Sequence, residues 1–95
     1  MRYEWDENKR LINLQKHGLD FRDAPEVLSD PFGIEIIAIV NGEERTHFIG
    51  EFEGHPMVGF VVYTERVSAN REDVIRIISF RKATRGERML YENGI

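Results

Sequence analysis

The hydrophobic pattern of this chain changes its period at about residue 33, and this change limits the chain to folds that combine helices with a sheet. Before it, residues 6–18 have the pattern of a helix, with an aspartate as N-cap and a glycine at the C-terminal end. After it, segments 34–40 and 47–52 are rich in strand-forming residues and flank Asn41-Gly42, a strong hairpin signal. The pattern therefore predicts an α+β fold.

Capping residues and turns predict the remaining elements. Residues 1–5 can form a short first strand, and a second helix begins at either Asp20 or Asp23 and ends at Asp30-Pro31. Three further elements complete the chain: strands over 57–64 and 74–80, and a last helix over 84–94 that begins with a capping box. We expect the order strand, helix, helix, four antiparallel strands, helix: a small antiparallel sheet with two N-terminal helices and one C-terminal helix.

The absence of cysteine excludes disulfides, thiolate nucleophiles, cysteine-based zinc sites and iron–sulfur clusters. The chain also lacks the Gly-x-Ser-x-Gly pattern of serine hydrolases and a phosphate-binding glycine loop. Its first residues do not resemble a signal peptide, and no apolar run is long enough to span a membrane. A chain of 95 residues is long enough for one domain, which we expect over 1–95. Without a signal peptide or an apolar span, we expect it in the cytoplasm and without membrane contact.

Positive charge gathers near the C-terminal end of a chain whose formal net charge is -4. Residues 1–60 carry six basic and twelve acidic side chains, whereas residues 66–88 carry seven basic and three acidic ones. Six of those seven are arginines, whose planar guanidinium suits phosphate recognition. This segment is either a phosphate-binding surface or an ordinary solvated face.

Alternation along the two most apolar strands sorts their side chains into faces. On the 57–66 segment, we expect Val58, Phe60 and Val62 to form the core face. The other face, with Gly59, Val61, Tyr63 and Glu65, would then line an open groove.

Arg76 and Arg81 fall on opposite faces of a regular strand, so they cannot both reach one ligand. Either a bulge near Ser79 brings them together, or one of the two is structural.

The three histidines lack the spacing of a metal site, and we expect no metal ion or other cofactor. His17 lies at a helix C-terminus, where a cation is favoured, and His55 lies in a turn. His47 is either a polar residue at the rim of a strand or a proton carrier.

An ordered set of short motifs resembles one protein family. The motifs are Tyr3-Glu4-Trp5-Asp6-Glu7-Asn8-Lys9, Lys16-His17-Gly18 with Phe21, Asp30-Pro31, Tyr63-Thr64-Glu65-Arg66, Arg76-Ile77-Ile78-Ser79-Phe80-Arg81-Lys82-Ala83-Thr84, Glu87-Arg88 and Tyr91-Glu92. Together they are similar to the BrnT family of bacterial toxins. The resemblance implies a RelE-like fold, a ribonuclease toxin of a type II toxin-antitoxin module, and a BrnA-type ribbon-helix-helix antitoxin. That antitoxin would bind the operator DNA, so the toxin would contact DNA only indirectly.

The resemblance also implies a mechanism in which the 2′-OH of the RNA attacks the adjacent phosphate without a metal ion. We expect Arg81 and Arg76 to bind the phosphate, Lys82 to add positive charge, and Glu65 or His17 to carry the proton. The expected RNA-binding residues are Arg66, Tyr63, Arg85, Arg88 and Tyr91, with the two tyrosines stacking on bases. The alternative is a module that binds an antitoxin or nucleic acid and has lost ribonuclease activity.

Overall fold

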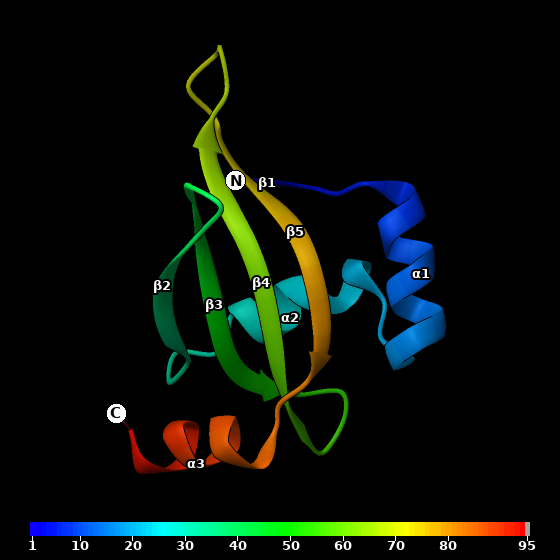
Figure 1. Cartoon of the computed structure of the whole chain (residues 1–95), viewed down its shortest axis with the longest axis vertical. Coiled ribbons are helices and arrows are strands. Elements are labelled where there is room, and N and C mark those ends of the chain that lie inside the picture. The colour runs from blue at the N-terminus through cyan, green and yellow to red at the C-terminus, as the bar shows by residue number, and fades with distance from the viewer. Residues whose placement is uncertain (95) are drawn as a thin grey trace.

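The computed structural model describes residues 1–94, which form five strands and three α-helices around one mixed sheet (Figure 1). The elements in chain order are β1 (Arg2–Glu4), α1 (Glu7–His17), the 3-10 helix η1 (Phe21–Asp23), α2 (Ala24–Leu28), β2 (Ile34–Val40), β3 (Glu43–Phe52), β4 (Met57–Val67), β5 (Asp73–Lys82) and α3 (Arg85–Asn93). The strand order across the sheet is β1-β5-β4-β3-β2. The α+β class is confirmed.

The sheet differs from the prediction at its first strand. Strands β2 to β5 are antiparallel as expected, but β1 pairs in parallel with β5 and places Glu4 beside Arg76. The sheet is therefore mixed rather than antiparallel. The helices follow β1, and the second predicted helix is divided: Asp20 caps η1, and Asp23 precedes the five-residue α2.

Local turn and cap signals are confirmed. Asp6 accepts a hydrogen bond from the Lys9 N–H at the start of α1, and Gly18 ends that helix with a φ of 71°. Asn41 and Gly42 have φ values of 52° and 77°, as a two-residue hairpin turn requires. Thr84 and Glu87 form the capping box of α3.

The main core contradicts the predicted orientation of β4. Val61 and Tyr63 are buried under the helical layer with Phe21 and Val27, on the face that was expected to be an open groove. Phe60 belongs instead to a smaller cluster with Ile49 and Ala83. Both faces of β4 are apolar, so alternation alone could not show which face the helices cover.

A β-bulge in β5 changes the direction of its side chains. Val62 pairs with Ser79 and Tyr63 pairs with Ile77, so Ile78 is the extra residue. Ile77 and Phe80 can therefore both face the main core. The bulge predicted near Ser79 as one of two alternatives is present.

Asn13 of α1 completes the hydrogen bonding of β5 beyond the end of β1. Its side-chain amide donates to the Phe80 carbonyl at 2.7 Å, and its oxygen accepts from the Phe80 N–H at 3.2 Å. The same amide group donates to the Leu19 carbonyl at 3.0 Å. Asn13 is buried, and it takes the place of a neighbouring strand at this point of the sheet.

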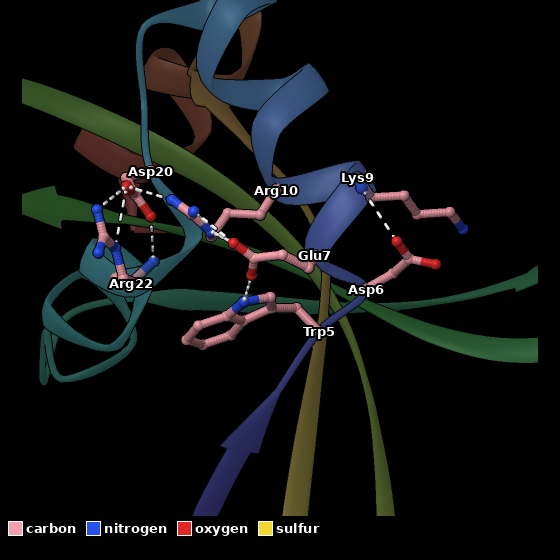
Figure 2. Close-up of polar contacts among 7 residues, drawn as sticks. All are labelled: Trp5, Asp6, Glu7, Lys9, Arg10, Asp20 and Arg22. Atoms are coloured by element: carbon pink, nitrogen blue, oxygen red, sulfur yellow. Dashed lines mark hydrogen bonds and ion pairs between the residues drawn. The ribbon is translucent and has the colours of Figure 1, made fainter.

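An ion-pair network joins the start of α1 to η1 (Figure 2). Arg10 contacts Glu7 and, at 2.9 Å, Asp20, while Asp20 also accepts from Arg22 at 2.8 Å. The hydrogen bond from Arg22 is the main cause of a lowered Asp20 pKa. The Trp5 indole N–H donates to Glu7 at 3.1 Å. These contacts fix the helical layer against which the sheet packs.

Candidate functional site

The face of the sheet that points away from η1 and α2, which we call the open face, brings together chemically active side chains from four strands. Cross-strand neighbours share a face, and the observed pairing defines its rows. The rows are Glu4, Arg76 and Thr64; Ser79, Val62 and His47; and Arg81, Phe60 and Ile49. Because of the bulge, both predicted phosphate ligands, Arg76 and Arg81, lie on this one face.

Strand β5 ends beside α3 (Figure 1), and Arg81, the second-last residue of β5, therefore lies at the end of the open face nearest α3. Its guanidinium donates to the two Glu87 carboxylate oxygens at 2.7 and 2.9 Å, and lies 4.1 Å from the centroid of the Phe60 ring. The bond from Arg81 is the largest cause of a lowered Glu87 pKa. Since Glu87 also closes the capping box, Arg81 is linked to the first turn of α3.

Arg76 and Arg66 share one carboxylate at the other end of the open face. Arg76 Nη1 lies 3.1 Å from Glu4 Oε2, and Arg66 contacts Glu4 Oε1. The hydrogen bond from Arg66 is the main cause of a lowered Glu4 pKa. The Arg76 side chain is 43% exposed, so solvent reaches this ion pair.

His47 lies on the open face between the two arginine clusters. It pairs with Val62 in the row that also contains Ser79, and its ring centroid is 5.2 Å from that of Phe60. The sequence left His47 as either a polar rim residue or a proton carrier, and it did not show which face of the sheet His47 occupies. That information comes from the register of β3 against β4.

The two predicted proton carriers lie away from this face. Glu65 pairs with Ile75, and this register places it on the side of the sheet that carries the helical layer. His17 is exposed in the last turn of α1. The structure therefore does not bring either residue together with Arg76 and Arg81.

Tyr63 is not available for base stacking. Its side chain is 3% exposed, and burial is the main cause that raises its pKa to about 12. The stacking role expected for this tyrosine is wrong, because its ring is part of the main core.

Three other predicted residues meet near α3. Lys82, Arg88 and Tyr91 line a cavity of about 400 Å³ together with Glu51, Pro56, Met57, Val58 and Glu92. The Tyr91 hydroxyl donates to the Asp30 carboxylate at 2.5 Å, and this bond is the main cause that raises the tyrosine pKa to about 12. Arg85 is exposed in the first turn of α3.

Within residues 1–94, no group of three His, Asp or Glu side chains is placed to hold a metal ion. None of the described helices is both long enough and apolar enough to cross a membrane.

Comparison with known protein families identifies the chain. The sequence model described as "Ribonuclease toxin, BrnT, of type II toxin-antitoxin system" matches residues 5–87. The chain belongs to the BrnT family. Its membership implies an RNA substrate and an antitoxin partner. No curated protein matches the chain. In this BrnT-family chain, the matched region contains His47, Arg76 and Arg81 and ends at Glu87, the ion-pair partner of Arg81.

Proposed function

We propose that this chain is an endoribonuclease toxin that cleaves RNA on the open face without a metal ion. Arg76 and Arg81 bind the scissile phosphate, and His47 carries a proton. The observation that supports this proposal is the β5 bulge, which places Arg76, Ser79 and Arg81 on one face. We also propose that the fold is RelE-like, as the resemblance of the sequence implies, and that the toxin acts on RNA in the cytoplasm.

The geometry suits a phosphate bound between neighbouring strands. Strands β3 and β5 flank β4, so their backbones lie about 10 Å apart. Long side chains from Arg76 and His47 can span that gap from opposite sides. The hydroxyl groups of Thr64 and Ser79 lie on the same face and can donate to phosphate oxygens.

The reaction is an attack of the RNA 2′-oxygen on the adjacent phosphorus. A base removes the 2′-OH proton, the new P–O bond forms a dianionic phosphorane, and the 5′-oxygen leaves with a proton from an acid. The guanidinium groups stabilise the negative charge that develops on the phosphorane. His47 lies on the open face, and its imidazole is a group that can exchange a proton in this reaction.

The carboxylates that pair with the arginines do not prevent this role. The Glu4 pair is partly exposed, so an RNA phosphate can replace Glu4 on Arg76 and Arg66. Arg81 has five N–H donors, and those directed at Glu87 leave others for a phosphate oxygen.

Paired variants on the two faces test this proposal. Arg76→Ala and His47→Gln should abolish growth arrest and reduce RNA cleavage, whereas Glu65→Gln and His17→Gln should retain both. Loss of one positioned donor typically costs about 10²- to 10³-fold in rate. Full cleavage by His47→Gln, or loss of cleavage only in Glu65→Gln, would overturn the assignment of the open face.

We further propose that a BrnA-type ribbon-helix-helix antitoxin neutralises the toxin by covering Arg66, Arg81 and Lys82. These residues lie on or beside the surface that would bind phosphate, so an antitoxin that covers them would keep RNA from the site. A structure of the complex in which all three remain exposed would contradict this idea. Normal growth and intact RNA at high expression of the wild-type chain would instead favour the non-catalytic binding module.

A further inference from the structure

Strand β2 is an edge of the sheet with an apolar sequence and unusual exposure. It is the last strand in the order β1-β5-β4-β3-β2, and its seven residues include no proline or glycine and one charged residue, Glu35. Ile37 and Ile39 are 57% and 67% exposed. Edge strands in natural proteins are usually protected by lysine, proline or a bulge, because unpaired backbone groups bind other strands.

The hairpin turn determines which backbone groups of β2 point outward. In a hairpin closed by two residues, the flanking residues exchange both backbone hydrogen bonds, so Val40 bonds to Glu43. Bonded and non-bonded pairs then alternate along the ladder. The outward N–H and C=O groups therefore belong to Glu35, Ile37 and Ile39.

These three residues are symmetric about Ile37, and this symmetry makes the edge complementary to itself. An antiparallel copy centred on Ile37 places Ile37 opposite Ile37 of the second chain, and Glu35 opposite Ile39 of that chain. Every outward backbone group of the three residues then has a partner in a hydrogen-bonded pair. A closed two-fold interface requires this kind of self-complementary surface.

The charges and side chains also fit a second copy. In this register, the charged residue of one β2 lies opposite an isoleucine and not opposite its own equivalent, so no like charges oppose each other. On the other face of β2, Ile36 lies opposite Ala38 of the copy, and Ile34 lies opposite Val40. The second copy would also cover Ile37 and Ile39, whose side chains are more than half exposed within the described chain.

We propose that two copies of this chain associate through their β2 edges, antiparallel and centred on Ile37, to form one continuous ten-stranded sheet. The interface is small, so association depends on concentration. Strand β5 lies three strands away from β2, and the dimer therefore leaves Arg76 and Arg81 uncovered.

Cysteine cross-linking tests the register, because the natural chain contains no cysteine. In Ile37→Cys, the two Cα atoms lie about 5.5 Å apart across the axis, within the range that a disulfide spans. In Ile39→Cys, they are separated by four residue steps, about 14 Å, which a disulfide cannot span. Ile39 is the more exposed of the two, so random collisions would favour its cross-linking.

We expect mild oxidation to give a disulfide dimer of Ile37→Cys and to leave Ile39→Cys monomeric. Equal cross-linking of both variants, or cross-linking of neither, would overturn the proposal. Cross-linking of neither would indicate that the β2 edge binds a different chain, such as an antitoxin segment.

Sedimentation provides an independent test without new covalent bonds. The wild type should show a concentration-dependent dimer that Ile37→Lys abolishes, while Ile12→Lys, a matched change at an exposed isoleucine of α1, should dimerise like the wild type. Circular dichroism would show that both variants fold. A wild type that stays monomeric at every concentration, or an Ile37→Lys variant that dimerises normally, would refute the interface.

Discussion

Replacing Arg81 with alanine should destabilise this protein more than replacing Arg76. The sequence alone did not decide which of the two arginines has the more structural role. In the structure, Arg81 is 31% exposed, bonds both oxygens of a Glu87 side chain that is 20% exposed, and packs on Phe60. Arg76 is 43% exposed and makes a single contact with Glu4.

The size of the difference follows from the contacts. A hydrogen-bonded interaction with a charged group contributes about 1.5–3 kcal/mol, and a cation over an aromatic ring adds about 0.5–1 kcal/mol at a partly exposed site. Arg81→Ala should therefore lower the free energy of unfolding by about 2–3 kcal/mol, which corresponds to a fall of about 10–20 °C in Tm for a domain of this size. Arg76→Ala breaks an exposed ion pair and should lower the free energy of unfolding by only about 0–1 kcal/mol.

Urea unfolding followed by the fluorescence of Trp5, the single tryptophan, measures both variants. Arg81→Lys retains the charge but loses the two-oxygen contact, and should fall between the wild type and Arg81→Ala. A free energy of unfolding for Arg81→Ala equal to or above that of Arg76→Ala would refute this reasoning. The result also affects how growth assays are interpreted. Arg81→Ala can lose growth arrest through slower RNA cleavage or through lower stability, whereas a loss in Arg76→Ala reflects RNA cleavage more directly.

Of three further predictions, one concerns the same ion pair and two concern contacts elsewhere in the structure. Because Arg81 lowers the Glu87 pKa, the pair stabilises the fold above the usual pKa of 4.5 and loses this effect as the pH falls through the lowered value. The difference in free energy of unfolding between the wild type and Arg81→Ala should therefore become smaller below about pH 4.5, as urea titrations at several pH values would show. Asn13→Ala leaves the N–H and C=O of Phe80 without their partner and should lower the free energy of unfolding by about 2–3 kcal/mol. Hydrogen exchange at the Phe80 amide should become faster, and unchanged exchange there would contradict the role given to Asn13. Tyr91→Phe removes the bond to Asp30 and should cost about 1–2 kcal/mol in thermal unfolding, whereas Tyr3→Phe serves as a control that leaves this bond in place.

The features that the sequence predicted well depend on a few neighbouring residues. Asn41-Gly42 specifies a hairpin because both residues must adopt positive φ, and Thr84 with Glu87 specifies a helix start because each side chain bonds the other's backbone. Such signals act over four residues or fewer, so no knowledge of the tertiary fold is needed to interpret them.

The features that the sequence could not predict depend on distant partners. The Ile78 bulge lies in a run of apolar residues with no local mark, and it is set by the need to place both Ile77 and Phe80 in the core. For the same reason, His47 could not be assigned to the face that carries Arg76, and Glu65 was expected there instead. Pairing registers across three strands decide these positions.

Both N-terminal elements depend on the last strand of the sheet, and this dependence affects the order in which the toxin can fold. Strand β1 pairs with residues 74–76, and Asn13 of α1 bonds to Phe80. During synthesis, β1 and α1 leave the ribosome first, but neither has its partner in the sheet until β5 follows, and contacts this distant in sequence form slowly. The open face, which includes residues of β1 and β5, is therefore complete only when nearly the whole chain has been made. A growing chain would carry no assembled phosphate site, and the ribosome that makes the toxin would finish it before it can act.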